Sequence, residues 1–281
     1  MSAPLVSTEW LQAHLADPNL HVVDASWSMV RTPAETRADF EAAHIPGAQF
    51  FDIEALSDHA TALPHMLPPV AAFAAGMSAL GIGDETFVVT YDTAGLYSAP
   101  RAWWMLRAMG HDNVAVLDGG LPKWRRENRP VEQGPGTVVH ARFTARPRPA
   151  LVRDFETMQV NLQSRAEQVV DARSPARFRA EEPEPRPGLR AGHMPGSRNV
   201  HYAEVVAPDG TLKPPAELRR LFAERGVDLA RPIVTSCGSG ITAAIVLLAL
   251  DVAGAKETAL YDGSWAEWGS RAEASVVTGA P

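Results

Sequence analysis

The residue with the clearest capacity for covalent chemistry is Cys237, which stands in the stretch Val234-Thr235-Ser236-Cys237-Gly238-Ser239-Gly240-Ile241-Thr242. A β-branched run precedes it and an apolar run follows it, which predicts a loop between a strand and a helix. Two glycines let backbone N–H groups point inward, and the helix adds the positive end of its dipole. Both effects stabilise negative charge on sulfur and favour the nucleophilic thiolate. The pattern predicts a catalytic cysteine; the alternative is a buried cysteine that acts as a small hydrophobic residue.

Cys237 is the only cysteine of the chain, and this limits the chemistry. An intramolecular disulfide, a Cys-x-x-Cys pair and a multi-cysteine zinc site are excluded. A group that Cys237 takes up must therefore pass to another molecule. A cysteine phosphatase would need a Cys-x5-Arg loop to hold phosphate oxygens, and the arginine position is Ala243. The 9 histidines include no His-x-x-x-His pair beside carboxylates, so we expect no metal site. No cofactor is predicted either.

The composition narrows the class of protein. The chain has 281 residues, of which 46% are hydrophobic and 21% charged. This is ordinary globular composition, and a prior of about 150 residues per domain suggests two domains. No apolar run approaches the roughly 20 residues of a membrane-spanning helix. The net charge of −7 disfavours nucleic-acid binding. Because Met1 to Leu5 lack the basic start and apolar stretch of a secretory signal, we expect a cytoplasmic protein with no membrane or nucleic-acid partner.

Four short segments recur in the same order in both halves of the chain. Val22-Val23-Asp24 returns as Val169-Val170-Asp171, and His44-Ile45-Pro46-Gly47 returns as His193-Met194-Pro195-Gly196. Two later sets return as well: Val89-Thr90 with Gly95 as Val234-Thr235 with Gly240, and Asp118-Gly119 with Trp124 as Asp262-Gly263 with Trp268. The offsets are similar, for example 171 − 24 = 147 and 262 − 118 = 144. The chain is therefore predicted to contain a duplicated unit of about 130 residues.

Each half is predicted to be an α/β domain. The predicted boundaries are 1–132 for the N-terminal domain, 133–150 for a linker rich in proline and glycine, and 151–281 for the C-terminal domain. Short β-branched runs predict strands at 20–24, 87–91, 114–117, 168–171, 233–236 and 258–261, and helical periodicity predicts helices at 99–109 and 241–252. This alternation predicts mainly parallel sheets flanked by helices on both faces. Ligands of such folds bind at the carboxyl ends of strands, where Cys237 is placed.

Taken together, these motifs resemble the two-domain rhodanese family of sulfurtransferases. The resemblance rests on the repeat, the two His-x-Pro-Gly segments, the loop from Cys237 to Thr242 and Asp262-Gly263-Ser264-Trp265, and it covers nearly the whole chain. It implies two tandem rhodanese-like domains, of which only the C-terminal one is catalytic. The first half agrees, because the position aligned with Cys237 is Asp92, and an aspartate cannot carry a sulfane sulfur. The loop sequence is similar to the branch of the family whose sulfur donor is 3-mercaptopyruvate, whereas members that prefer thiosulfate usually carry basic residues after the cysteine.

The resemblance also implies how the donor is bound. The family's substrate arginines match Arg177 and Arg186, and a guanidinium group binds a carboxylate through two hydrogen bonds. The alternative for both is a surface ion pair with a neighbouring acidic residue, which could be Glu181, Glu182 or Glu184. Four residues of the loop match the backbone that cradles donor and persulfide: Gly238, Gly240, Ile241 and Thr242.

A Ser–His–acid relay that has been proposed in this family matches Ser239, His65 and Glu54. A neutral imidazole at His65 would polarise Ser239, which would assist removal of the donor's thiol proton or stabilise the enolate. Glu54 would orient His65. The alternative for Ser239 is a small residue that fits a tight loop. His44 and His193 recur in both halves, including the half without a cysteine, so we predict that they fix a turn and take no part in catalysis.

The implied activity is a double displacement. The Cys237 thiolate takes sulfur from 3-mercaptopyruvate, pyruvate leaves, and Cys237 holds a persulfide until a second molecule accepts the sulfur. Since the chain has no second cysteine, the acceptor is external: cyanide, a small thiol or a reduced thioredoxin. One alternative is a thiosulfate:cyanide sulfurtransferase, although a loop without basic side chains predicts poor use of thiosulfate. A second alternative is a non-catalytic rhodanese-like binding module.

Overall fold

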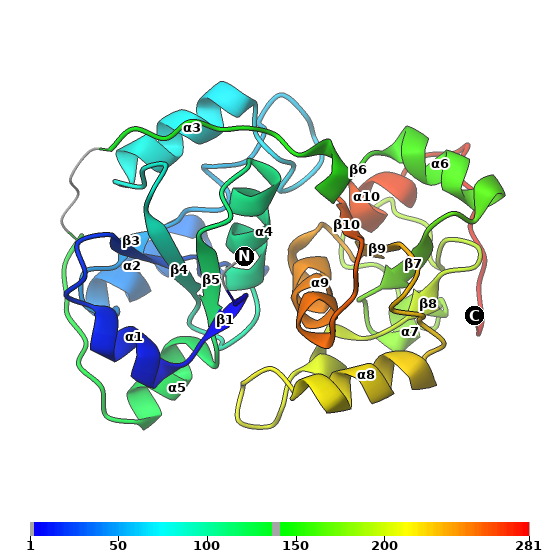
Figure 1. Ribbon diagram of the computed structural model, residues 1–281. Coiled ribbons are helices and arrows are strands. Elements are labelled where there is room, and N and C mark those ends of the chain that lie inside the picture. The colour runs from blue at the N-terminus through cyan, green and yellow to red at the C-terminus, as the bar shows by residue number, and fades with distance from the viewer. Residues whose placement is uncertain (1–2, 137–140, 281) are drawn as a thin grey trace. The chain divides into compact units, whose positions relative to one another are not determined.

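The computed structural model describes residues 3–136 and 141–280, which form two units (Figure 1). Residues 137–140 of the predicted linker lie outside the described part. The described residues within Met1–His59, Leu67–Arg148 and Ala207–Leu212 form unit 1, and those within Ala60–Met66, Pro149–Val206 and Lys213–Pro281 form unit 2. Each unit therefore includes a short segment from the opposite half of the sequence.

Unit 1 is built on a five-stranded parallel sheet in the order β1-β5-β4-β2-β3. Its strands are β1 (Leu5–Val6), β2 (Leu20–Asp24), β3 (Gln49–Phe50), β4 (Phe87–Tyr91) and β5 (Val114–Leu117). Its helices are α1 (Thr8–His14), α2 (Pro33–Ala42), α3 (Val70–Ala79), α4 (Ala99–Ala108) and α5 (Gly120–Arg126). The β-branched runs form the three central strands, because a parallel strand covered on both faces needs nearly continuous apolar side chains.

Unit 2 repeats this topology with the order β6-β10-β9-β7-β8, again parallel. Its strands are β6 (Val152–Arg153), β7 (Gln168–Asp171), β8 (Arg198–Asn199), β9 (Ile233–Ser236) and β10 (Thr258–Tyr261). Its α-helices are α6 (Phe155–Ser164), α7 (Pro175–Phe178), α8 (Pro215–Glu224), α9 (Ile241–Ala253) and α10 (Ser264–Trp268), with 3₁₀ helices η1 (Pro149–Leu151) and η2 (Tyr202–Val205). The predicted fold class, α/β with mainly parallel sheets flanked by helices, is confirmed.

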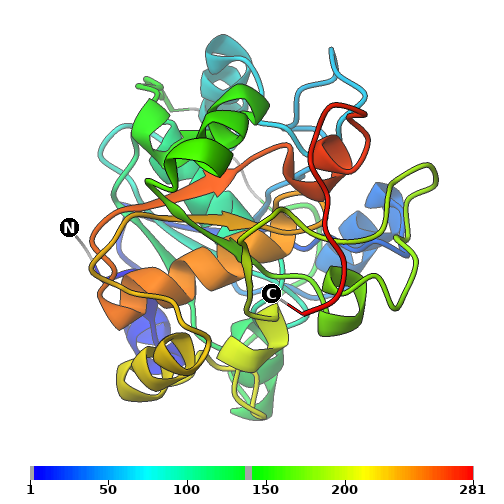
Figure 2. The ribbon, with the colours of Figure 1, turned by 90° about the vertical axis from the view of Figure 1, so that its right-hand side faces the viewer.

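The register of the sheets decides which residues leave them at the carboxyl edge. In unit 2, β7 pairs with β9 so that Asp171 lies opposite Ser236, and Cys237 is the next residue of the chain. In unit 1, Asp24 lies opposite Tyr91 in the same way. Figure 2 shows the orange helix α9 beside strands β9 and β10, against which it packs. The sequence thus brings Cys237 to the end of a buried strand, directly before a buried helix.

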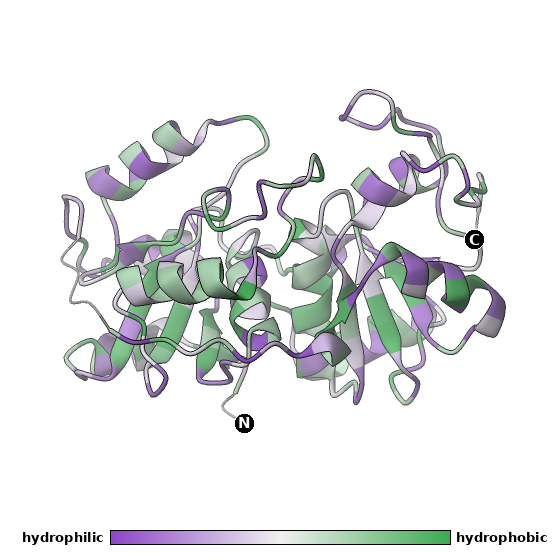
Figure 3. Ribbon diagram, turned by 90° about the horizontal axis from the view of Figure 1, so that it is seen from above, coloured by the Kyte–Doolittle hydropathy of each residue, from purple (hydrophilic) through white to green (hydrophobic). Residues whose placement is uncertain are grey.

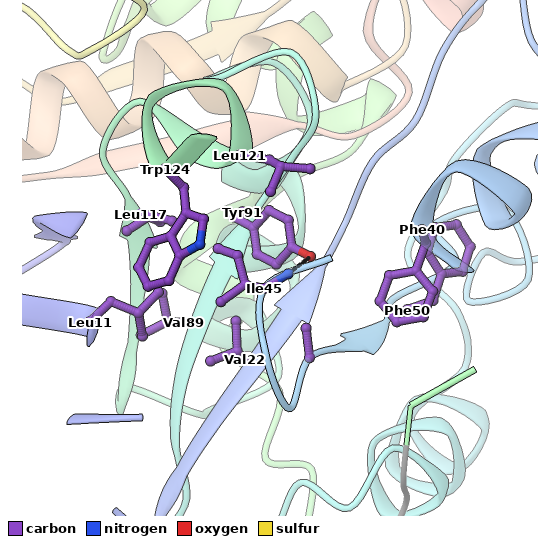
Figure 4. Packing of buried hydrophobic residues seen from close by; sticks show 11 residues of the cluster. Leu11, Val22, Phe40, Ile45, Phe50, Val89, Tyr91, Leu117, Leu121 and Trp124 are labelled. Atoms are coloured by element: carbon purple, nitrogen blue, oxygen red, sulfur yellow. Dashed lines mark hydrogen bonds between the residues drawn. The ribbon is translucent and has the colours of Figure 1, made fainter. Parts of the chain in front are cut away.

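The core of unit 1 joins β2, β4 and β5 to their covering helices (Figure 4). The buried Tyr91 ring lies within it, and its hydroxyl accepts a hydrogen bond from the Ile45 N–H at 3.3 Å. In unit 2 the corresponding cluster includes Trp265 and Trp268 of α10, both fully buried. Figure 3 colours the strands largely as hydrophobic, whereas several surrounding helices also carry hydrophilic residues. In the described part of the chain, no helix is both long enough and apolar enough to cross a membrane.

His44 and His193 have equivalent structural surroundings in the two units. The Nδ1 atom of His44 donates to the Phe40 carbonyl at 2.8 Å, and the two rings stack 4.1 Å apart. The Nδ1 atom of His193 donates to the Phe178 carbonyl at 2.8 Å, with rings 3.7 Å apart. Burial lowers the pKa of His193, which favours the neutral ring. These contacts support the predicted structural role of both histidines.

Candidate active site

Cys237 is a free cysteine, 2% exposed, at the carboxyl end of β9. Its sulfur accepts a hydrogen bond from the Gly240 N–H at 3.1 Å. Gly240 has a φ of +81°, in the left-handed region that favours glycine, and it caps α9 without a side-chain acceptor. The first N–H groups of an α-helix have no acceptor within the helix, so those of Ile241 and Thr242 remain available to negative charge near the sulfur.

The start of α10 holds the backbone of the cysteine loop. The Cys237 N–H donates to the Ser264 hydroxyl at 3.2 Å, and this hydroxyl donates to the Tyr261 carbonyl at 2.9 Å. The Trp265 N–H donates to the Cys237 carbonyl at 2.9 Å. Ser264 is fully buried, and its φ of +49° is unusual for a residue other than glycine. Sequence reasoning missed Ser264. The available signal was a difference between the two halves, because the aligned residue of the first half is Gly120.

Two predicted arginines border Gly238, the residue after the cysteine. A Cβ atom on Gly238 would lie 3.2 Å from Nη2 of Arg177 and 3.7 Å from Nη1 of Arg186. Arg177 is placed by α7, whose first turn is capped by Ser174, which accepts the Arg177 N–H at 3.3 Å. Arg186 also donates to the Ser239 hydroxyl at 3.3 Å. Two guanidinium groups beside one glycine can receive a carboxylate next to the sulfur.

The alternative to donor binding by Arg177 is a surface ion pair with an acidic neighbour. Arg177 does form an ion pair, but its partner is not on the surface. Arg177 donates to both oxygens of Glu184, through Nε at 3.3 Å and Nη2 at 2.5 Å. The Glu184 side chain is only 2% exposed. By contrast, the pair between Arg179 and Glu181 is exposed to solvent.

Behind Glu184 lies Arg173, a residue that sequence reasoning missed. Its side chain is fully buried and donates to Glu184 at 2.7 Å and to Asp171 at 2.6 Å. Burial alone would lower the pKa of Arg173, but the charges of Asp171 and Glu184 more than offset this and raise it. Its guanidinium carbon also lies 4.1 Å from the centre of the Trp265 ring. Arg173 therefore links β7, Glu184 and α10.

The three residues of the predicted relay are placed differently from one another. In unit 2, His65 Nδ1 lies 3.2 Å from the backbone carbonyl of Ser239, whereas the predicted relay involves the hydroxyl. Because a carbonyl only accepts hydrogen bonds, Nδ1 carries the proton in this contact. His65 is 3% exposed and has a φ of +61°. Glu54 belongs to unit 1, where it accepts a hydrogen bond from the Trp27 indole at 2.6 Å. The relay stays a prediction.

In unit 1 the loop aligned with the cysteine loop contains its own anion. The buried carboxylate of Asp92 accepts hydrogen bonds from four backbone N–H groups, each 2.8 to 2.9 Å away: those of Ala94, Tyr97, Ser98 and Ala99. The last three surround the start of α4. An anion is therefore held at the helix N-terminus by backbone groups, as expected for this kind of loop. Within residues 3–136 and 141–280, no three His, Cys, Asp or Glu side chains gather into a group that could hold a metal ion.

Asp24 stands at the end of β2, as Asp171 stands at the end of β7. Asp171 is paired with Arg173, whereas the residue aligned with Arg173 in the first half is Ser26, so the charge of Asp24 has no such compensation. Desolvation raises the pKa of Asp24 from 3.8 to about 6, against hydrogen bonds from Ser26 and with the help of the Asp92 charge. The folded state thus binds the Asp24 proton more tightly than the unfolded state. Asp24 therefore costs stability above about pH 6, and this cost disappears below about pH 4.

Asp24→Asn is expected to stabilise the protein at about pH 7.5 by about 1 to 3 kcal/mol, since a shift of one pKa unit corresponds to about 1.4 kcal/mol. The gain should vanish near pH 4. Denaturant unfolding at both pH values measures it. Asp171→Asn is the matched control and should destabilise the protein, because it removes a counter-charge of the buried Arg173. Equal destabilisation by both substitutions at about pH 7.5 would contradict this account of Asp24.

Known proteins resemble this chain over nearly its whole length. The family model for the rhodanese-like domain matches residues 7–127 and again 155–271. The human protein named 3-mercaptopyruvate sulfurtransferase is 45% identical over 279 residues, which cover 97% of this chain and 94% of the human one. A thiosulfate sulfurtransferase of Cricetulus griseus is 41% identical over 271 residues, which cover 94% of this chain and 91% of that protein. The crystal structure of SseA from Escherichia coli, described as a 3-mercaptopyruvate sulfotransferase of rhodanese fold, matches with a TM-score of 0.85 at 42% identity, over 94% of this chain and 99% of that chain.

Proposed function

This chain belongs to the rhodanese family of sulfurtransferases, and from that premise we propose that it moves sulfur from 3-mercaptopyruvate to an external acceptor through a persulfide on Cys237. The observation that carries the proposal is the placement of Arg177 and Arg186 beside Gly238, directly after a cysteine whose sulfur accepts a backbone hydrogen bond. The site thus combines a nucleophile with a receptor for a carboxylate.

The first step is binding of the donor. 3-Mercaptopyruvate carries a carboxylate beside a ketone, and the guanidinium groups of Arg177 and Arg186 hold this end of the molecule. Its thiol sulfur then lies toward Cys237. Positioning of this kind replaces a bimolecular encounter by a reaction within one complex.

The second step transfers the sulfur atom. The Cys237 thiolate attacks the donor sulfur, a new S–S bond forms, and the C–S bond of the donor breaks. The electron pair of that bond leaves as the enolate of pyruvate, which takes up the proton that the donor's thiol releases. Cys237 keeps the persulfide, and the Gly240 N–H together with the first turn of α9 stabilises its negative charge. Ser239 and His65 are proposed to assist the proton transfers, and the part that Glu54 takes in the relay remains a prediction.

The third step returns the cysteine to its thiolate form. A thiophile attacks the outer sulfur and carries it away, and the acceptor is proposed to be cyanide, a small thiol or a reduced thioredoxin. The acceptor must be external because Cys237 is the only cysteine of the chain. The cytoplasmic location expected from the sequence remains a prediction.

The nearest alternative to 3-mercaptopyruvate as the sulfur donor is thiosulfate, which carries a different charge. The name of the Cricetulus griseus relative supports this alternative. Arginines beside Gly238 would attract this dianion too. The loop itself contributes no basic side chain, since Gly238, Ser239 and Gly240 follow the cysteine. We therefore propose 3-mercaptopyruvate as the better donor and thiosulfate as the poorer one.

Steady-state sulfur transfer to cyanide tests the function directly. We expect kcat/KM for 3-mercaptopyruvate to exceed that for thiosulfate by at least about tenfold, a difference of about 1.4 kcal/mol in transition-state binding. Pyruvate should appear in equal amount to thiocyanate. A preference for thiosulfate would overturn the donor assignment but leave the nucleophile in place. A lack of activity with both donors would favour the binding-module alternative.

A further inference from the structure

Glu184 is an enclosed acidic side chain in contact with a proposed donor-binding residue, Arg177. It stands between Pro183 and Pro185, and its carboxylate accepts hydrogen bonds from Arg173 on one side and Arg177 on the other. With Asp171 at the far end, four charges alternate in sign through unit 2, in the order Asp171, Arg173, Glu184 and Arg177. The first three side chains of this series are at most 2% exposed, whereas that of Arg177 is 20% exposed.

This arrangement fixes the direction of the Arg177 guanidinium. Nε and Nη2 both donate to Glu184, and Nη2 is also the atom that lies 3.2 Å from the Cβ position of Gly238. Glu184 itself is held by the fully buried Arg173. An arginine side chain loses much conformational freedom when it binds a ligand, and a side chain that is already held loses less.

The same arrangement changes the charge beside the cysteine loop. Asp171 and Glu184 together balance Arg173 and Arg177, so the four groups have no net charge. Glu184 keeps the hydrogen-bonding geometry of Arg177, but it cancels most of the long-range attraction that the charge of Arg177 would exert on an anionic donor. Coulomb energy is proportional to the charge of the ligand, so a dianion loses twice as much attraction as a monoanion.

We propose that Glu184 is a specificity-determining residue for the sulfur donor: by holding Arg177 and cancelling its charge, it favours a donor with one carboxylate over a dianion such as thiosulfate. This inference rests on the proposed function of the site. Glu184 acts through Arg177 and is a positioning residue, with no contact to the reacting sulfur required.

The test compares kcat/KM for 3-mercaptopyruvate and for thiosulfate in wild type, Glu184→Gln and Glu184→Asp. Glu184→Gln removes the charge at nearly constant shape and should lower the preference for 3-mercaptopyruvate about tenfold, mainly by raising kcat/KM for thiosulfate. Glu184→Asp keeps the charge but shortens the side chain. It should raise KM for 3-mercaptopyruvate several-fold, leave kcat nearly unchanged and bring no gain with thiosulfate.

Glu181→Gln is the matched control, because it makes the same chemical change in the exposed pair with Arg179 and should leave the donor ratio unchanged. An unaltered ratio in folded Glu184→Gln would overturn the inference. If that variant does not fold, Glu184→Asp decides, and a KM equal to that of wild type overturns it. Wild type that fails with 3-mercaptopyruvate in the same assay would instead overturn the proposed function.

Discussion

Cys237→Ser is expected to lower sulfur transfer to cyanide by at least about 10⁴-fold with either donor, because a serine hydroxyl is a far weaker nucleophile than a thiolate and cannot form a persulfide. The substitution changes one buried atom, and the Gly240 N–H that contacts the sulfur can donate to oxygen as well. The unfolding midpoint should therefore change little. Steady-state rates measure the loss.

Mass spectrometry distinguishes the loss of the group that carries the sulfur from an indirect loss of activity. Wild type treated with 3-mercaptopyruvate without an acceptor should gain the mass of one sulfur atom on the peptide that contains Cys237. Cys237→Ser should gain none. Retention of more than about one per cent of the activity by a folded Cys237→Ser protein would show that another group carries the sulfur.

Arg186→Met is expected to lower kcat/KM for 3-mercaptopyruvate about 100-fold, mostly through KM, because it removes one of the two guanidinium groups beside Gly238. Hydrogen bonds to charged groups contribute about 1.5 to 3 kcal/mol each, which corresponds to this range. Methionine keeps much of the side-chain length and packing. Arg186→Lys retains the charge without the planar fork and should recover part of the loss.

Arg179→Met is the control for this experiment, since Arg179 belongs to the same region of the chain but pairs with Glu181 in solvent. It should behave like wild type. An Arg186→Met protein with unchanged KM for 3-mercaptopyruvate would rule out a role of Arg186 in holding the carboxylate.

The central strands could be predicted from sequence because their residues have a physical reason to be apolar throughout. The ranges 87–91 and 233–236 agree with β4 and β9 as the structure has them, and the helix predicted at 99–109 ends one residue earlier, at Ala108. Edge strands such as β8 could not be predicted. β8 consists of Arg198 and Asn199 alone, and two polar residues paired on one side carry no periodic signal.

Residues that hold the structure of the candidate site were harder to predict than residues proposed to bind the donor or carry the sulfur. Cys237 was predicted from its own loop, and Arg177 and Arg186 came from family resemblance, but Arg173 and Ser264 were missed. A comparison of the two halves contains the missing signal. Arg173 aligns with Ser26 and Ser264 aligns with Gly120, so both are positions where the repeats differ, as Cys237 and Asp92 do. The comparison of the two halves does not predict that the segment around His65 belongs to unit 2, because this placement depends on tertiary structure.

The Asp92 carboxylate occupies the loop of unit 1 that aligns with the cysteine loop of unit 2. A covalently attached ligand has an effective concentration that no free molecule in solution matches. Four backbone N–H groups hold the Asp92 carboxylate, so a free anion would have to displace it in order to bind that loop. We therefore expect the loop of unit 1 to bind no free anion. In the proposed reaction the corresponding loop of unit 2 differs, because the anion beside it changes in every cycle.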